Sequence, residues 1–242
     1  MSRITASTGR RLACGALAAL SAFTAPPAAA EAACTAAVVL DGSIGVREWA
    51  GARRIIVGAG VEGMAMRDAQ AVYFAFRTDS YDIGHAYLGG GGEVLVLHAS
   101  GSLGSAVYSR AGDGWTLRAP FAWELRDPAI RKDGHPSPDG HAREQAAHWQ
   151  RQGWVAATAM MGTRGESEMK VSLAKIRQAG GRVAFGWFSG PDGTRAYHHL
   201  PAGATVGAEA DEARLFMGEA PATADLSPSG WWRPEDIPCA AG

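Results

Sequence analysis

The chain has 242 residues, of which 19% are charged, and its 23 Lys and Arg against 24 Asp and Glu give a formal net charge of -1. A balance this close to neutral does not favour nucleic acid or an anionic membrane surface as a partner. The length suits one all-β domain preceded by an export signal, and such a domain buries a substantial core.

Residues 1–30 have the pattern of a signal peptide. Arginines form a basic start, an apolar run of small residues follows, and Ala28-Ala29-Ala30 offers the small residues that a signal peptidase needs. The apolar run is too short to cross a bilayer as a stable helix, so a retained membrane anchor is the disfavoured alternative and no stable membrane insertion is expected. We therefore expect a periplasmic or secreted protein with a single mature domain over residues 31–242.

Two cysteines remain after cleavage, because Cys14 leaves with the signal. Cys34 and Cys239 lie at opposite ends of the mature domain. An even count in an oxidising compartment predicts one disulfide that ties the termini together, with two free thiols on frayed ends as the alternative. Closing so long a loop stabilises the fold by about 5 kcal/mol as an upper estimate in the chain-entropy model.

The mature chain begins with an unusual stretch over residues 40–52. It reads as the end of a strand, a tight turn at Asp41-Gly42, and one or two helical turns that carry Glu48 and Trp49. Trp49 is expected to bury its large ring against the body of the domain, because a tryptophan in such a setting usually packs.

Strands are predicted along most of the remaining chain, because apolar residues alternate with period two or form short apolar runs between glycine-rich turns. Val94 to Leu97 is continuously apolar, which is typical of a strand covered on both faces. The predicted strands cover residues 72–77, 94–97, 106–109, 115–118, 154–160, 168–173 and 183–188, with a hairpin turn over 110–114.

One segment has helical character, residues 139–152, with Asp139 as a cap and Gly153 at its end. The tail over 221–238 is rich in proline, serine and acidic residues and is predicted to be coil. Together these elements predict an all-β fold: a jelly-roll-like, two-sheet antiparallel β-sandwich with one short inserted helix and a coil C-terminal tail.

Three segments carry a family resemblance: Asp41-Gly42 followed by Glu48-Trp49-Ala50, the strand over 72–77 with Thr78-Asp79 after it, and the strand that begins at Glu168. Together they resemble a secreted β-sandwich of the family nine carbohydrate-binding module type, related to DOMON-like domains, in an uncharacterised bacterial subgroup. The resemblance implies sugar binding by a clamp of aromatic rings and, in many relatives, a structural calcium ion.

Trp115 and Trp123 are the rings expected to stack on a sugar, and His98 is added to the ligand-binding set. Apolar sugar faces stack on flat rings, while sugar hydroxyls need polar side chains nearby. The chain has 8 tryptophans, and a packing role explains each of them equally well.

Two metal sites are considered. His141, Glu144 and His148 share one face of the predicted helix and offer two imidazoles and a carboxylate to zinc. Asp79 and Asp82 offer oxygens to calcium. A solvated helix face explains the first set as well, and turn chemistry explains the second.

Some DOMON-like relatives bind haem b between a methionine and a histidine, so haem b is an alternative cofactor. The resemblance makes candidate axial ligands of Met64, Met66, Met160, Met161, Met169, His85 and His98. Methionine in strands is also a common core filler.

No catalytic constellation is recognisable. The chain lacks a Gly-x-Ser-x-Gly elbow and a His-Glu-x-x-His motif. Glu93, Glu124 and Glu166 are the carboxylates considered as a glycosidase pair, and His198-His199 reads as a surface pair. The sequence therefore predicts an exported, non-catalytic protein that binds a saccharide or other small ligand. A periplasmic haem-binding redox module and a structural or partner-binding envelope protein are the alternatives.

Overall fold

The computed structural model describes residues 34–126, 138–161, 164–190, 195–207 and 209–240. The predicted signal peptide lies outside this range. Within the described residues, no helix is long and apolar enough to cross a membrane.

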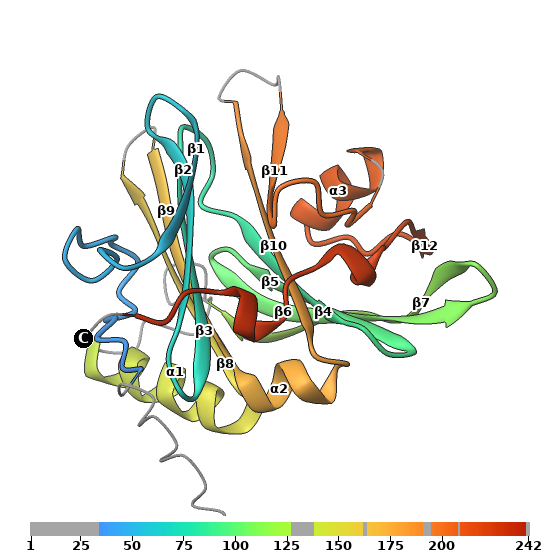
Figure 1. Cartoon of the computed structure of the whole chain (residues 1–242), viewed down its shortest axis with the longest axis horizontal. Helices are drawn as coiled ribbons and strands as arrows, with labels where there is room; N and C mark the ends of the chain where they lie inside the picture. Colours follow the sequence, from blue (N-terminus) through green and yellow to red (C-terminus); the bar gives the residue numbers. More distant parts are fainter. Residues whose placement is uncertain (1–33, 127–137, 162–163, 191–194, 208, 241–242) are drawn as a thin grey trace, which may run out of the picture. The chain divides into compact units, whose positions relative to one another are not determined.

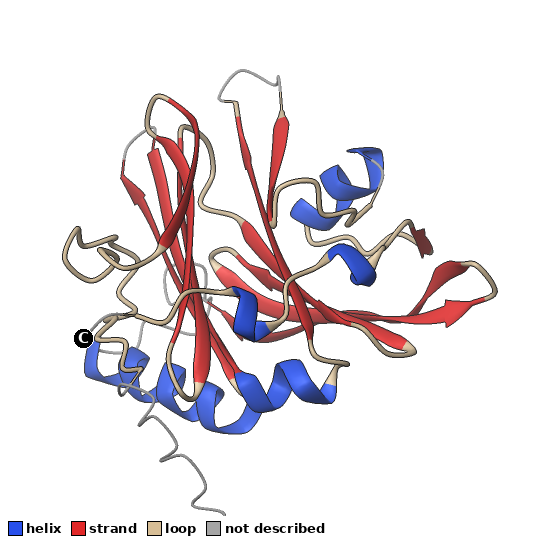
Figure 2. Cartoon of the chain, viewed as in Figure 1, coloured by secondary structure: helices blue, strands red, loops and turns tan. Residues whose placement is uncertain are grey.

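The chain folds into two antiparallel sheets, as predicted (Figures 1 and 2). The first is five-stranded, in the order β1 (Arg53–Gly58), β2 (Val61–Arg67), β3 (Ala71–Thr78), β9 (Arg164–Ser172) and β8 (Trp154–Met161). The second is seven-stranded, in the order β11 (Ala196–Leu200), β10 (Arg182–Ser189), β4 (Gly84–Gly89), β5 (Glu93–Ala99), β6 (Ser102–Ala111), β7 (Gly114–Arg126) and β12 (Thr223–Ala224). The β6–β7 hairpin confirms the turn predicted between them.

The inserted helix is confirmed as α1 (Pro138–Gln152), and two shorter helices accompany it, α2 (Leu173–Gln178) and α3 (Glu209–Phe216). The expectation of a single helix is therefore incomplete. The C-terminal tail is mostly irregular, as expected, but it also supplies β12 and two single turns of 3-10 helix, η2 (Pro228–Gly230) and η3 (Pro234–Asp236). The two short helices depend on tertiary packing for their stability, because isolated helices of six to eight residues are only marginally stable.

The main core lies between the two sheets and is built on aromatic rings. Phe74 of β3 stacks on Phe185 of β10 with ring centroids 4.5 Å apart. Trp187 is fully buried beside them and packs against Gly63, where an added Cβ would lie only 2.4 Å from the indole. Gly63 is therefore the residue that lets β2 approach this ring.

The seven-stranded sheet is covered on its other face as well. Tyr87, Val96 and Tyr108 of this sheet pack against Leu215 and Trp231 of the C-terminal segment in a second buried cluster. This explains the continuous apolar run in β5 and confirms that the strand is covered on both faces.

The N-terminal segment covers the outer face of the five-stranded sheet. Trp49 is fully buried, which confirms its core role, and its indole N–H donates to Glu168 at 2.9 Å. The backbone N–H groups of Asp41 and Gly42 donate to the same carboxylate. The predicted strand end is not formed. The predicted helical turns are present only as hydrogen-bonded turns, in which Trp49 N–H donates to the carbonyl of Gly45, and Ala50 and Ala52 N–H donate to the carbonyls of Arg47 and Trp49.

The two ends of the domain meet at the end of β2. Cys34 and Cys239 form a disulfide with Cα atoms 5.6 Å apart, as predicted. Arg67 donates its N–H to the carbonyl of Pro238, and its own carbonyl accepts from Ala240 N–H, each at 2.9 Å. The disulfide therefore closes a loop that contains both sheets.

Replacing Cys34 and Cys239 together by Ser is expected to lower the free energy of unfolding by up to about 5 kcal/mol, because the unfolded chain regains the entropy of a very long loop. Denaturant unfolding with and without a reductant measures this loss. Equal unfolding midpoints for the oxidised protein, the reduced protein and the variant would contradict it.

Glu168 makes the stability of the fold depend on pH. Burial raises its pKa from 4.5 to about 7, although hydrogen bonds from Trp49, Gly42 and Asp41 act in the opposite direction. Between these pH values the folded state keeps a proton that the unfolded state has lost, so raising the pH favours unfolding. We expect the stability of the protein relative to a Glu168→Gln variant to fall as the pH rises from 4.5 to about 7. Unfolding titrations of both proteins across this range provide the measurement, and a pH-independent difference is the contrary result.

Candidate functional site

A row of histidines crosses the outer face of the seven-stranded sheet. The strands place these residues opposite one another in register, so their side chains emerge on one face. From β11 to β7 the row reads His199, Gly186, His85, His98, Gly104 and Trp123.

Helix α3 lies on this row. The carbonyl of Leu215 is 3.2 Å from His85 Nε2, and the ring of Phe216 packs edge-on against the same imidazole, with centroids 4.4 Å apart. Glu212 reaches His199. Gly218 ends the helix with a positive φ of 75° and a pair of closing hydrogen bonds typical of a Schellman motif.

Hydrogen bonds assign the tautomers of the two central histidines. A carbonyl only accepts, so His85 Nε2 carries a proton and shares it between Leu215 and His98 Nδ1, which lies 2.9 Å away. His98 Nδ1 is then an acceptor, and its Nε2–H donates to the hydroxyl of Ser100 at 3.0 Å. His98 is therefore not placed to take a proton from Ser100, as a general base of a Ser–His pair must.

Burial keeps both imidazoles neutral. It lowers the pKa of His98 to about 4 and the pKa of His85 well below its ordinary value, and His98 lowers the latter further. Two neutral rings with fixed tautomers orient the groups next to them through their hydrogen bonds.

Trp123 stands at the solvent-facing end of the row. Its side chain is 40% exposed, while Trp149 is half-buried and the other six tryptophans are buried. Phe121 stacks on it with centroids 5.9 Å apart, and His98 contacts it edge-on at 5.2 Å. The ring also lies so close to Gly104 and Gly218 that a Cβ at either position would come within 2.9 Å of it. These contacts hold the ring in one orientation.

A β-bulge explains why Trp123 points outwards. Gly104 pairs with Trp123 and Leu103 pairs with Leu125, so Glu124 has no partner in the ladder. The extra residue turns Leu125 into the core between the sheets while Trp123 stays on the outer face.

The two predicted sugar-stacking rings do not form one clamp. Trp115 and Trp123 are eight residues apart on β7, which separates them by about 25 Å along a strand. Trp115 is 3% exposed and donates its indole N–H to the carbonyl of Leu226. It borders a polar hollow of about 500 Å³ with Arg110 and Arg182, but its ring faces are packed. The structure does bring Trp123 and His98 together.

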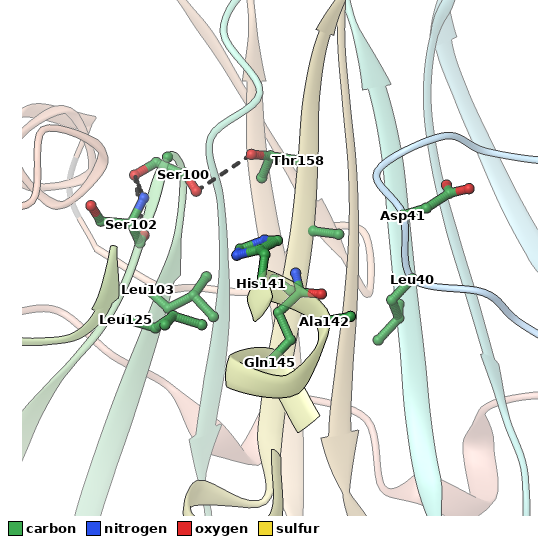
Figure 3. Close-up of a pocket in the computed structure, with 13 residues that line it drawn as sticks. Leu40, Asp41, Ser100, Ser102, Leu103, Leu125, His141, Ala142, Gln145 and Thr158 are labelled. Carbon is green, nitrogen blue, oxygen red and sulfur yellow. Dashed lines mark hydrogen bonds between the residues drawn. The ribbon is translucent and has the colours of Figure 1, made fainter. Parts of the chain in front are cut away.

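A second hollow, of about 330 Å³, lies where α1 meets the ends of both sheets (Figure 3). His141 and Gln145 of α1 face Ser100 across it, and Thr158 donates to the carbonyl of Ser100 at 3.4 Å. Among the described residues, His141 is the only one with an aromatic ring that lines this hollow.

The described residues contain no group of three or more His, Cys, Asp or Glu side chains placed to hold a metal ion. The three residues considered for zinc have different surroundings. His141 lines the hollow, whereas the ring of His148 is buried against Trp154 and lies 3.6 Å from Glu124. Glu144 has an interaction partner of its own.

The two aspartates considered for calcium also have interaction partners within the protein. Asp79 accepts a hydrogen bond from the backbone of Gly190 at 2.9 Å, and Asp82 also has a partner. Neither predicted metal site is therefore assembled in these residues.

The candidate haem ligands lie on different faces of the sandwich. Met64 and Met66 pack beneath the N-terminal segment on the outer face of the five-stranded sheet, and Met169 lies between the sheets. His85 and His98 lie on the outer face of the other sheet, so none of these methionines opposes them. The side chains of Met160 and Met161 lie outside the described part of the structure.

The three glutamates considered as catalytic carboxylates each have other partners. Glu93 pairs with Arg118, and Glu166 pairs with Arg77 at 2.7 Å. Glu124 accepts hydrogen bonds from Ser105 and Trp154. These contacts account for the three side chains without a shared catalytic cleft.

Sequence reasoning missed the ion pair between Glu212 and His199 and took His199 for a surface residue. Period-two alternation shows that His85 and Tyr87 share a face and that His198 and His199 point to opposite faces. The register between distant strands, which aligns the histidines, has no signal in a single sequence.

No protein-family model, curated protein or solved structure matches this chain. The resemblance to carbohydrate-binding modules and DOMON-like domains therefore stays a prediction, and the fold and the site geometry are the basis for the function proposed below.

Proposed function

We propose that this protein is an exported, non-catalytic carbohydrate-binding β-sandwich that stacks a sugar ring on Trp123. The observation that most directly supports this proposal is that Trp123 is the only exposed tryptophan among the eight. Apolar sugar faces bind to flat aromatic rings, and a ring exposed to water at a fixed orientation suits that contact.

The surroundings of Trp123 support a preorganised platform. Phe121 stacks behind it, His98 holds its edge, and the backbones of Gly104 and Gly218 leave the ring little freedom to turn. A side chain that is already ordered loses little entropy on binding, which favours affinity.

Export is supported by the disulfide between Cys34 and Cys239, since such bonds persist in oxidising compartments. The signal pattern over residues 1–30 agrees with it. Periplasmic or secreted location is thus part of the proposal.

Replacing Trp123 by Ala is expected to weaken binding of oligosaccharides about tenfold, because one aromatic stacking contact contributes roughly 1 to 1.5 kcal/mol. Calorimetric titration against a glycan panel measures the affinity of both proteins. Tyr81→Ala is the matched control, because Tyr81 is an exposed aromatic residue (59%) of the β3–β4 connection, outside the row. A flat titration of the folded protein across the panel, or equal affinities for the protein and the Trp123→Ala variant, would refute the proposal.

A further inference from the structure

The end of β7 contributes to two neighbouring features of the protein: the exposed ring of Trp123 and the hollow of about 330 Å³ at the ends of both sheets (Figure 3). The bulge at Glu124 leaves Trp123 on the outer face of the seven-stranded sheet and turns Leu125 to its inner face, where Leu125 lines the hollow. One strand end therefore supplies a residue to each feature.

A short series of contacts joins the two features. The imidazole of His98 packs edge-on against Trp123 with centroids 5.2 Å apart, and its Nε2 lies 3.0 Å from Ser100 Oγ. Ser100 lines the hollow, so a single imidazole links the ring of Trp123 to the rim of the hollow. The next lining residue, Gly101, adds no side chain to this rim.

The turn that forms the rim is held by its own hydrogen bonds. Ser100 Oγ donates to the carbonyl of Ser102 and accepts from the N–H of Ser102, each at 3.2 Å. Thr158 of the five-stranded sheet donates to the carbonyl of Ser100. The hollow and the ring of Trp123 are thus preformed next to each other, and preformed sites lose little entropy when a ligand binds.

The hollow combines a polar group with an apolar wall. The side-chain amide of Gln145 lines it, offers both a donor and an acceptor, and forms no hydrogen bond with the described residues. Leu40, Leu103 and Leu125 supply apolar surface. A sugar unit has hydroxyl groups around an apolar face, so it matches this combination.

Size and charge narrow the choice of ligand. Ligand pockets measure about 300 to 1,000 Å³, so a hollow of about 330 Å³ suits one small unit. No Lys or Arg is present among the described residues that line it, whereas Asp41 is. An anionic sugar would find no opposite charge here, which favours a neutral one.

We propose, on the basis of the function above, that this hollow is a second subsite for the ligand of Trp123. The protein then binds a neutral oligosaccharide of at least two units, with one unit stacked on Trp123 and a further unit hydrogen-bonded to Gln145 in the hollow. Because the units are joined, the second contact is intramolecular once the first has formed, and the affinity rises with chain length until both subsites are filled.

The test uses the full mature protein with glucose, mannose and xylose, each as the monosaccharide and as linear oligosaccharides of increasing length. Monosaccharides are expected to shift the indole N–H signal of Trp123 alone in a nitrogen-15-edited spectrum. Oligosaccharides of the sugar that binds are expected to shift the side-chain amide signals of Gln145 as well, and to bind at least about tenfold more tightly than the monosaccharide.

Gln145→Leu removes the amide from the hollow. It is expected to weaken oligosaccharide binding about two- to tenfold, the effect of a net hydrogen bond, and to leave the binding of the monosaccharide unchanged. Gln152→Leu is the matched control, because Gln152 is a half-buried glutamine of the same helix and is not among the residues described as lining the hollow.

A second pair of variants fills the hollow. Ala142→Tyr places a ring in it from an exposed position on α1 and is expected to abolish the gain of affinity with chain length. Ala147→Tyr, at an exposed position of α1 outside the described lining, is expected to keep that gain.

Equal affinities for a monosaccharide and its oligosaccharides, or unchanged oligosaccharide affinity in both Gln145→Leu and Ala142→Tyr, would overturn the second subsite and leave stacking on Trp123 in place. Tighter binding of oligogalacturonate than of the neutral oligosaccharides would overturn the neutral ligand. The absence of any shift of the Trp123 signal with all of these sugars would reject the stacking platform and the subsite together.

Discussion

Burial of the seven-stranded sheet on both faces is the constraint on which the rest of the structure depends. One face packs on the five-stranded sheet, and the C-terminal segment from Ala204 to Trp231 covers the other. Because much of this second face is buried, polar side chains on it are stabilised by partners inside the protein. The histidine row and its contacts with α3 follow from this burial.

The same constraint separates structural from functional residues. His85 and His98 are neutral, hydrogen-bonded to one another through His85 Nε2 and His98 Nδ1, and held in single tautomers, so they order the surface above them. Water reaches the row at Trp123, the residue that combines exposure with a fixed ring. The N-terminal segment covers the outer face of the five-stranded sheet in the same way, and Glu168 and Arg77 of that sheet form hydrogen bonds with its backbone.

Much of the fold could be predicted from the sequence, because the signals are local. The alternation in β3, the apolar run in β5 and the helical pattern of α1 all depend on neighbouring residues, although α1 begins at Pro138, one residue before the predicted cap Asp139. The two cysteines left after the predicted signal had only each other as partners. The candidate site depends on register and on a bulge at Glu124, which bring His199, His98 and Trp123 into one row. From the sequence, Trp115 and Trp123 are equally good candidates for a sugar-stacking ring, and only their different burial in the structure distinguishes them.

The most direct test of the account is a nitrogen-15-edited spectrum of the indole N–H groups during titration with an oligosaccharide. With 8 tryptophans, eight indole signals are expected. If Trp123 is the ring on which the sugar stacks, its signal shifts progressively while those of the buried rings, Trp115 included, do not change. A shift confined to Trp115 or another buried tryptophan, or no shift at saturating oligosaccharide, would contradict it.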